Sequence, residues 1–316
     1  MNQYDVVVIG GGAAGLSAAL VLSRARREVL VVDAGAPRNA PATHMHGFVS
    51  RDGTAPGELL AAGRREVKGY GGDVVDGQAV SARRAGAVFE VEPGGGVTVR
   101  ARRVVVATGL RDELPDVHGL RERWARDVLH CPYCHGYEVR GQAFGVLGWT
   151  QEAVRYAQIV RQWSDDVVLF APPASLTEDE REQLAARAVG VVEGHVASVV
   201  VEDDTLRGVA LADGRFVRRD VVFVPPRFVP DNDLLLELGC DIDDTGWVVT
   251  DATGRTTVPG VWAAGNVRDP RAQVITAAGQ GSAAAVAINA DLVEEDVRDA
   301  VRAHRDSIAH RDSIAQ

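Results

Sequence analysis

A glycine-rich loop near the start of the chain limits the possible folds more than any other feature. Residues 10–15 read Gly-Gly-Gly-Ala-Ala-Gly and fit the spacing G-x-G-x-x-G. The loop follows an apolar run at residues 4–9 and precedes a helical pattern at residues 13–25. A second apolar run at residues 28–32 ends at Asp33. Such runs are typical of strands buried on both faces, so the segment predicts a βαβ unit in a parallel sheet.

The same loop has the pattern of a dinucleotide site. The first glycine permits a tight turn, the second lets the backbone approach a diphosphate, and the third lets the helix pack closely on the strand. The diphosphate lies at the helix N-terminus, and the acid that ends the second strand binds the ribose. The alternative is a glycine-rich turn without a ligand, which the combination of strand, helix and terminal acid disfavours. The residues predicted to contact the dinucleotide in this segment are Gly10, Gly12, Ala13, Ala14, Gly15 and Asp33.

A second unit of the same kind begins near the middle of the chain. Residues 143–148 predict a strand, residues 152–163 a helix and residues 167–170 another strand. A strand-rich stretch covers residues 191–224, and an Ala-rich helix is predicted at residues 275–293. The length of 316 residues corresponds to about two domains. The predicted fold class is therefore α/β, with two Rossmann-like, three-layer ββα dinucleotide-binding domains.

Shorter segments lie between these units. Residues 87–91 and 97–100 alternate in polarity around a turn of Pro93 and three glycines, which predicts an antiparallel meander. Residues 104–109 predict a separate strand that returns to the parallel sheet. The chain ends in a tandem hexapeptide, residues 304–309 and 310–315, for which a helical or frayed tail is a better interpretation than a solenoid.

Charge and hydropathy exclude several classes of protein. The chain has 34 Lys and Arg against 44 Asp and Glu, a net charge of −10, and no block of basic residues. A basic footprint for nucleic acid or for an anionic membrane is missing. The apolar runs are too short for a transmembrane helix, and the first lacks the basic region of a signal peptide. We therefore expect a cytoplasmic protein with neither nucleic-acid nor membrane partners.

The strongest chemical signal is the sequence Cys131-Pro-Tyr-Cys134-His135. Two cysteines at this spacing can form a disulfide within one helical turn, and a thiolate at a helix N-terminus has a lowered pKa. Pro132 suits the first turn of a helix. A metal site is the alternative, but Cys240 is distant and the sequence has no second ligand pair. The pair is therefore interpreted as redox-active, and Cys240 as a buried, inert thiol.

Three features together resemble the low-molecular-weight thioredoxin reductase family. They are the glycine loop, the C-x-x-C just before the second unit, and residues 254–266, which end in Gly265 and Asn266. The resemblance covers residues 5 to 293. Within it, Cys-x-x-Cys-His-Gly-Tyr-Glu is similar to the branch with the FAD-dependent dithiol oxidases of gliotoxin and holomycin biosynthesis. Thioredoxin reductases proper usually have Asp after the second cysteine.

The resemblance implies FAD as the cofactor, a homodimer, and roles for individual residues. It implies that Cys134 faces the flavin, that Cys131 exchanges with the substrate, and that His135 is the general acid and base. Glu138 either orients this imidazole or is only a charged helix residue. The further FAD contacts that it implies are Asn39, His46, Thr108, Gly109, Gly265, Asn266, Gln273 and Val274, with His44 as another candidate for a flavin or substrate contact. The FAD domain would comprise residues 1–115 and 247–316, and residues 116–246 would form an NAD(P)H-binding-like domain that carries the cysteine pair.

The chain departs from the reductase pattern at both nucleotide sites. At the FAD site Asn266 replaces the usual Asp and Ala272 the usual Arg, changes that leave FAD the expected cofactor. In the second unit, Trp149 and Thr150 replace two glycines that a diphosphate would need. Residues 170–175 lack the basic side chains that would hold the 2′-phosphate of NADPH. NADPH binding is therefore doubtful.

These observations favour oxidation of a dithiol. We expect a small-molecule or peptide dithiol to reduce the Cys131–Cys134 disulfide, FAD to take up the electrons, and O2 to reoxidise it. One alternative is an NAD(P)H-dependent thioredoxin-type disulfide reductase, with a thioredoxin-like protein as partner. Another is a flavin-binding protein with a regulatory or structural role, against which the intact cysteine pair argues.

Overall fold

The chain forms two compact units. The computed structural model describes residues 3–150 and 152–314, with side chains of the last helix described as far as residue 310. Unit 1 comprises Met1–Pro37, Gly57–Leu110 and Pro230–Gln316, and unit 2 comprises Arg38–Pro56 and Arg111–Val229. Three segments differ from the predicted domain limits, because residues 230–246 belong to unit 1 and residues 38–56 and 111–115 to unit 2. Local contacts explain this, since Leu235 is buried in the core of unit 1 and Arg38 forms two hydrogen bonds with Asp112 of unit 2.

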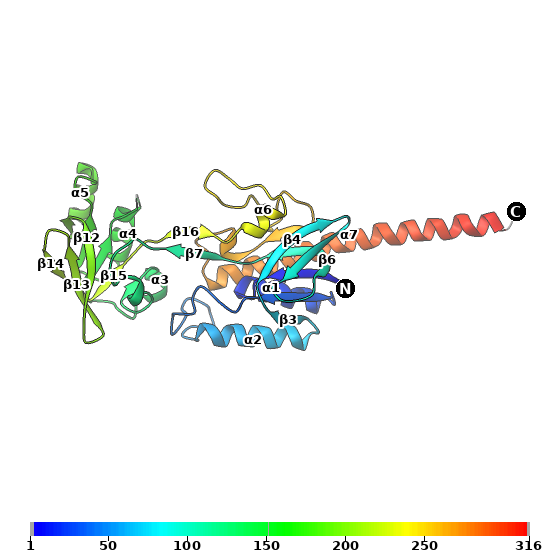
Figure 1. Cartoon of the computed structure of the whole chain (residues 1–316), viewed down its shortest axis with the longest axis horizontal. Helices are drawn as coiled ribbons and strands as arrows, with labels where there is room; N and C mark the ends of the chain where they lie inside the picture. Colours follow the sequence, from blue (N-terminus) through cyan, green and yellow to red (C-terminus); the bar gives the residue numbers. More distant parts are fainter. Residues whose placement is uncertain (1–2, 151, 315–316) are drawn as a thin grey trace. The chain divides into compact units, whose positions relative to one another are not determined.

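Unit 1 is built on a mixed sheet that has seven strands within the described part of the chain. The strand order is β3-β2-β1-β6-β5-β4, and β17 pairs with β6 outside this path (Figure 1). Pairing is parallel between β1, β2, β3, β6 and β17, and antiparallel between β4, β5 and β6. The strands are β1 (Gln3–Ile9), β2 (Val29–Asp33), β3 (Asp73–Asp76), β4 (Ala79–Ala85), β5 (Val88–Pro93), β6 (Val99–Val106) and β17 (Val261–Ala263).

Both faces of this sheet are covered. Val6 and Val8 of β1 pack with the helices α1 and α7, while Val7 and Ile9 face a second cluster that includes β4 and β5. Alternate residues of a strand point to opposite faces, so a continuous apolar run is what a doubly covered strand requires. The layers are therefore helix, parallel sheet and meander, as predicted. The helices of unit 1 are α1 (Ala13–Arg24), α2 (Pro56–Gly69), α6 (Asp233–Glu237), the 3-10 turn η2 (Gly265–Val267) and α7 (Val274–Ile314).

β6 is a single strand where the sequence predicted two. Residues 99–101 pair with β5, and residues 104–106 pair with β17. The predicted interruption lies at Arg102 and Arg103, and charged side chains are uncommon within a buried strand. In the structure both guanidinium groups form ion pairs with Glu295 of α7, so the strand continues through them.

Unit 2 contains a second parallel sheet with the order β11-β10-β9-β15-β8 and an antiparallel sheet of β12, β13 and β14. β9 pairs in parallel with β10, and α4 lies between them in the chain, which confirms the second βαβ unit. The strands are β8 (Val128–Leu129), β9 (Phe144–Leu147), β10 (Val167–Ala171), β11 (Val189–Glu193), β12 (Val196–Glu202), β13 (Thr205–Leu211), β14 (Phe216–Arg218) and β15 (Val221–Phe223). The helices are η1 (Arg121–Arg123), α3 (Pro132–His135), α4 (Ala153–Val160) and α5 (Glu178–Ala186). A two-stranded sheet is formed by β7 (Leu110–Glu113) and β16 (Arg227–Pro230).

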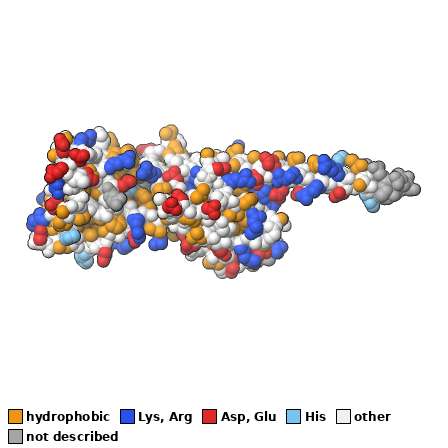
Figure 2. Space-filling model, turned by 90° about the horizontal axis from the view of Figure 1, so that it is seen from above, with side chains coloured by type: hydrophobic (Ala, Val, Ile, Leu, Met, Phe, Trp, Pro, Cys, Tyr) orange, Lys and Arg blue, Asp and Glu red, His pale blue; other side chains and the backbone are white. Residues whose placement is uncertain are grey.

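The last helix, α7, is longer than predicted. It has 41 residues and continues past residue 293, because neither Gly nor Pro follows Gly281 before Ile314. The first copy of the tandem hexapeptide is helical, and the second, residues 310–315, extends beyond the described residues. Both basic and acidic side chains lie along the part of α7 that extends past the sheet (Figure 2). Within the described residues, no helix is long and apolar enough to cross a membrane.

Candidate active site

The glycine loop of unit 1 forms a backbone cradle at the start of α1. Gly10 has a φ of +104°, and a Cβ there would lie 2.3 Å from the carbonyl oxygen of Ala107. A Cβ on Gly15 would lie 1.8 Å from the carbonyl oxygen of Gly10, so only glycine lets α1 approach β1 this closely. A Cβ on Gly12 would meet no atom within 4 Å. The loop is therefore tight on the protein side and open in front of the helix N-terminus, as a diphosphate site requires.

Asp33 lies beside this loop at the end of β2. Its Oδ1 accepts a hydrogen bond from the Gly11 amide at 3.0 Å, and its Oδ2 forms an ion pair with Arg64 of α2. Arg64 also bonds to Asp76 at 2.7 Å. Arg64 could not be identified from the sequence, because no local pattern connects it with an acid 31 residues earlier. Its guanidinium group holds the predicted ribose-binding carboxylate in place.

Two more predicted segments follow β6 and β17, which are neighbouring parallel strands. After β6, Thr108 Oγ1 donates to the Asp231 carbonyl at 2.6 Å, and Gly109 has a φ of +85°. After β17, Gly265 has a φ of +76°, and its amide donates to Gln280 Oε1 at 2.9 Å. Because β1 also pairs with β6, these segments and the glycine loop share one edge of the sheet. The predicted FAD contacts of unit 1 are thus brought together.

Asn266 is matched to its loop in a way that an aspartate would not be. Its Nδ2 donates to the carbonyl oxygens of Asp269 at 2.9 Å and of Ala272 at 3.0 Å. A carboxylate, the group usual in reductases, has no proton for either carbonyl. The predicted contacts Gln273 and Val274 follow at once, and α7 begins at Val274.

The redox pair of unit 2 is a disulfide between Cys131 and Cys134, with Cα atoms 5.2 Å apart. Cys131 is the N-cap of α3, and Pro132 occupies the first turn, as predicted. The amides of Cys134 and His135 both donate to the Cys131 carbonyl at 3.1 Å. α3 has only four residues. Its dipole therefore lowers the pKa of a thiolate at its N-terminus less than a full-length helix would.

His135 directly follows the disulfide and has an unused ring nitrogen. Its Nε2 is buried and has no hydrogen-bond partner among the described residues. Burial lowers the pKa of His135, although the Glu138 carboxylate acts in the opposite direction and raises it. The imidazole is therefore neutral near pH 7. A buried polar atom without a hydrogen-bond partner is unfavourable, so this nitrogen is suited to accept a proton from a thiol.

His46 lies between two carboxylates in the same unit. Its Nδ1 is 3.3 Å from Asp52 Oδ2, and its Nε2 is 3.5 Å from Glu138 Oε1. Asp52 also accepts a hydrogen bond from the Gly47 amide at 2.8 Å. Glu138 thus contacts His46 and acts electrostatically on His135. His46, predicted as an FAD contact, belongs with the residues around the disulfide, and Asp52 was missed from the sequence.

His130, just before the disulfide, was also missed. Its ring packs edge-on against Phe228, with centroids 5.2 Å apart, and its carbonyl accepts a hydrogen bond from the Tyr156 hydroxyl. Burial, helped by the positive charge of Arg38, lowers the pKa of His130 to about 4. His130 is therefore neutral, and its contacts fix the backbone that leads into Cys131.

Trp149 spans the place where the second unit would bind a nucleotide. The strand order of this sheet reverses at β9, so its switch point lies between β9 and β15, where open α/β sheets bind ligands at the carboxyl ends. Trp149 follows β9, and its indole Nε1 donates to the Pro225 carbonyl just after β15 at 2.7 Å. Thr150 Oγ1 is buried without a partner among the described residues. Gly148 is required by the fold itself, because a Cβ there would lie 2.6 Å from the Phe170 carbonyl oxygen.

The other predicted residues are less involved. Asn39 is half-buried and His44 exposed, and neither side chain makes a hydrogen bond within the described residues. Cys240 is buried, its Sγ lies 3.4 Å from Thr256 Oγ1, and burial raises the pKa of its thiol. The described part of the chain holds no group of three or more His, Cys, Asp or Glu side chains arranged for a metal ion.

Comparison with known proteins defines the class. Residues 4–282 match the family model described as pyridine nucleotide-disulphide oxidoreductase, and the chain belongs to this family. Among solved structures it is similar to one titled "Crystal structure of HlmI", at 59% identity and a TM-score of 0.94, covering 97% of this chain and 98% of that one. A structure titled "Crystal Structure of Putative Thioredoxin Reductase TrxB from Bacillus anthracis" is 30% identical with a TM-score of 0.88, covering 93% of this chain and 99% of that one. Thioredoxin reductase sirT of Leptosphaeria maculans is 31% identical over 313 residues, 93% of this chain and 96% of that protein.

These relatives confirm the predicted thioredoxin reductase-like family, and with it the fold class and FAD as the cofactor. The residues of unit 1 fit this group. Gly12 leaves open space at the N-terminus of α1, and Asp33 is held beside it. The residues that would hold FAD in unit 1 are Gly10, Gly12, Ala13, Ala14, Gly15, Asp33, Thr108, Gly109, Gly265, Asn266, Gln273 and Val274.

Proposed function

We propose that this protein oxidises a small-molecule or peptide dithiol to a disulfide through Cys131 and Cys134, with O2 as the final electron acceptor. The observation that carries the proposal is Trp149, whose indole joins the ends of β9 and β15 where a nicotinamide nucleotide would lie. Without that nucleotide, the electrons that reach the protein must come from a thiol substrate. The resemblance of Cys131–Glu138 to the dithiol oxidase branch supports the same direction of reaction.

Two thiol–disulfide exchange steps at Cys131 and Cys134 of unit 2 convert the substrate dithiol into a disulfide. One substrate sulfur attacks Cys131 Sγ, the Cys131–Cys134 bond breaks, and a mixed disulfide forms. The second substrate sulfur then attacks the mixed disulfide, so that the substrate leaves as a disulfide and both cysteines become thiols. Neutral His135 accepts a proton from the attacking thiol at Nε2 and returns it to the leaving sulfur. FAD supplies a two-electron acceptor that O2 can reoxidise, so the net reaction converts dithiol and O2 into disulfide and hydrogen peroxide.

The surroundings of His135 suit this proton transfer. Glu138 raises the pKa of His135 against the effect of burial, which keeps the imidazole able to accept a proton. His46 and Asp52 fix the position of Glu138 through the contact between His46 Nε2 and Glu138 Oε1. Glu138 and His46 are therefore assigned as positioning residues, and His135 as the catalytic base.

The test is anaerobic mixing of the FAD-loaded protein with five reductants, followed by the visible absorbance of the flavin. The reductants are dithiothreitol, dihydrolipoamide, reduced thioredoxin, NADPH and NADH. We expect at least one dithiol to bleach the flavin faster than either nucleotide, and Cys131→Ser and Cys134→Ser to abolish this. In air, one hydrogen peroxide should form per disulfide. Bleaching by NADPH or NADH but by none of the dithiols would overturn the proposal.

The same experiment decides between this function and the alternative, an NAD(P)H-dependent thioredoxin-type reductase. That alternative is supported by the similarity to proteins named as thioredoxin reductases. A flavin-binding protein without turnover would bleach with neither class of reductant. We further infer a cytoplasmic homodimer, which sedimentation of the FAD-loaded protein and localisation of a tagged chain would test.

A further inference from the structure

Unit 1 contains a cavity of about 250 Å³ whose lining includes none of the predicted FAD contacts. Its wall comes from β4, β5, β6, the loop before β17, and α7. Arginines dominate this wall, which we call the arginine cavity. Its charged lining residues are Arg84, Arg102, Arg103, Arg255, Arg298, Asp291 and Glu295. The lining has five arginines and two acids, and further acids outside the lining pair with Arg102 (Asp5 and Asp296) and with Arg298 (Glu294).

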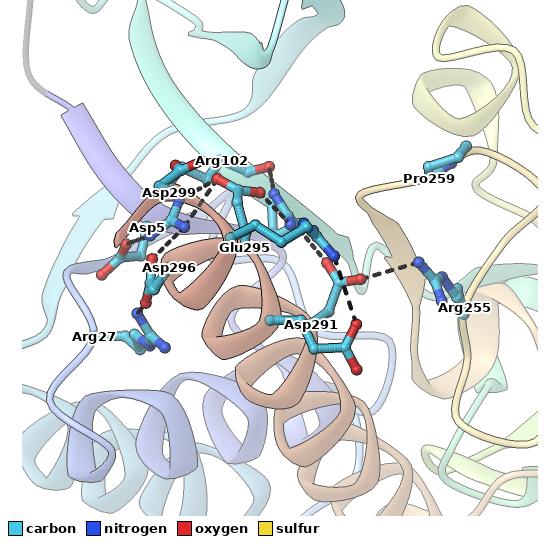
Figure 3. A network of polar contacts seen from close by, with 12 residues as sticks. Asp5, Arg27, Arg102, Arg255, Pro259, Asp291, Glu295, Asp296 and Asp299 are labelled. Carbon is cyan, nitrogen blue, oxygen red and sulfur yellow. Dashed lines mark hydrogen bonds and ion pairs between the residues drawn. The ribbon is translucent and has the colours of Figure 1, made fainter. Parts of the chain in front are cut away.

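Both acids of the arginine cavity are already fully engaged (Figure 3). Asp291 Oδ1 accepts from Arg255 at 3.0 Å, and its Oδ2 accepts from Arg103 at 2.6 Å. Glu295 Oε1 accepts from Arg102 at 2.9 Å, and its Oε2 accepts from Arg103 at 2.5 Å. Each carboxylate oxygen therefore has a guanidinium partner. The acids cannot neutralise the remaining arginines of the cavity.

Three arginines keep donors that the described residues do not use. Arg84 donates through Nη2 to the Pro259 carbonyl and has no carboxylate partner among them. Arg298 Nη1 forms an ion pair with Glu294 Oε2 at 3.8 Å, a separation too long for a hydrogen bond. Arg255 uses a single nitrogen, Nη2, in its bond to Asp291. These three side chains come from three different elements and line the same cavity.

We propose that the arginine cavity binds a small ligand through a phosphate group. Guanidinium groups match phosphate and carboxylate geometry, but a carboxylate presents two oxygens in one plane. A tetrahedral phosphate presents oxygens in several directions and carries about two charges on one small group, which suits donors that converge from three elements. The volume of about 250 Å³ lies below the roughly 300–1,000 Å³ of sites for larger ligands. Inorganic phosphate or a small phosphate ester fits the cavity.

Binding at this place would connect three elements of unit 1. A ligand held by Arg84, Arg255 and Arg298 joins β4, the loop before β17 and α7, and it binds only the folded protein. Such a ligand raises the melting temperature in proportion to the logarithm of its concentration above Kd. The thermal transition of the FAD-loaded protein therefore reports binding, with the flavin site already filled.

The experiment measures the melting temperature against increasing inorganic phosphate, glycerol 3-phosphate or succinate, at constant ionic strength set with NaCl. The variants are Arg84→Gln and Arg298→Gln, whose side chains are exposed and whose loss leaves no buried charge. Arg302→Gln is the matched control, because Arg302 is an exposed arginine of α7 that pairs with Asp299 and does not line the cavity. FAD content and flavin reduction verify that each variant is folded.

We expect a saturable rise in melting temperature with phosphate and an apparent Kd about tenfold weaker in Arg84→Gln and in Arg298→Gln, as for loss of a charged hydrogen bond. Arg302→Gln should bind like the unaltered protein. Tighter binding of glycerol 3-phosphate identifies an ester as the ligand, and tighter binding of phosphate identifies the free ion. Three results would each overturn the proposal: no effect of either phosphate compound beyond that of NaCl, equal weakening in Arg302→Gln, or succinate binding as tightly as both phosphates.

Discussion

Two glycines of α7 allow a matched test of how the FAD unit is assembled. Gly281 is buried against α1, and a Cβ there would lie 2.0 Å from the carbonyl oxygen of Ala14. Gly279, in the same helix, is exposed, and a Cβ there would meet no atom within 4 Å. Ala14 belongs to the first turn of α1, beside the cradle formed by Gly10 and Gly12. We therefore expect Gly281→Ala to disturb the cofactor site and Gly279→Ala to leave it intact.

The magnitude follows from the geometry. Real Cβ atoms do not approach other atoms closer than 3.0 Å, so in Gly281→Ala the two helices must separate by about 1 Å. Overpacking of this kind costs about 1–3 kcal/mol. Both substitutions gain the helix propensity of alanine, about 1 kcal/mol each, and this gain cancels between them. We expect Gly281→Ala to be about 1–3 kcal/mol less stable than Gly279→Ala, which corresponds to a melting temperature roughly 2–12 °C lower.

The assay is thermal unfolding of both purified variants, together with the ratio of flavin to protein absorbance. Gly281→Ala should also lose FAD on purification, because the displaced α1 carries the N-terminus that faces the diphosphate. Gly279→Ala should retain FAD and melt at or above the temperature of the unaltered protein. Equal melting temperatures and equal FAD content in the two variants would refute the assigned contact between α1 and α7.

Four further predictions concern the disulfide and the ion pairs. Glu138→Gln removes the carboxylate that raises the pKa of His135, so the acidic limb of flavin reduction by dithiol should move to lower pH; a move to higher pH would contradict the assignment. A thiol reagent should find no reactive thiol in the oxidised native protein, one in denaturant and three after reduction, because Cys240 is buried and the other two cysteines form the disulfide. Hydrogen bonds from Arg27 and Arg102 lower the pKa of Asp296. Burial raises the pKa of Glu295, but hydrogen bonds from Arg103 and Arg102 outweigh it, so this pKa is lowered too. The stabilisation of the folded protein by these two carboxylates should be complete above the unfolded carboxyl pKa of about 4 and be lost as the pH falls below it. Arg103→Leu removes one guanidinium partner from each of Asp291 and Glu295, which keep Arg255 and Arg102. It should cost about 2 kcal/mol at pH 7 and make the acid transition shallower, as urea unfolding at several pH values would measure.

The backbone of the cofactor cradle could be predicted because its requirements are local. The three glycines lie within six consecutive residues. Their spacing alone predicts a tight turn at Gly10, open space in front of Gly12 and close packing of α1 on β1 at Gly15. Gly281 follows the same steric logic, yet its partner Ala14 is far away in the sequence. A glycine in an Ala-rich helix gives no signal of which other helix it contacts. Only the folded structure shows this requirement.

The charged groups around the disulfide likewise include contacts that local sequence patterns cannot predict. The sequence identified Cys131, Cys134 and His135 because they are adjacent, and it left the role of Glu138 open. The contact between His46 and Glu138 joins two segments that are separated in the chain by α2 and by strands β3 to β8. No spacing rule connects such residues, because the fold of unit 2 brings them together.

Trp149 has a thermodynamic consequence for unit 2. A dissociable ligand stabilises a fold only to the extent that its concentration exceeds its Kd, so a nucleotide domain is less stable when the nucleotide is scarce. The indole of Trp149 is covalently part of the chain, and its bond from Nε1 to the Pro225 carbonyl forms whenever the unit is folded. Trp149 therefore stabilises this region of the fold without any dissociable ligand. On the proposed function, in which no nucleotide binds here, the stability of the unit that carries the disulfide is independent of the nicotinamide supply of the cell.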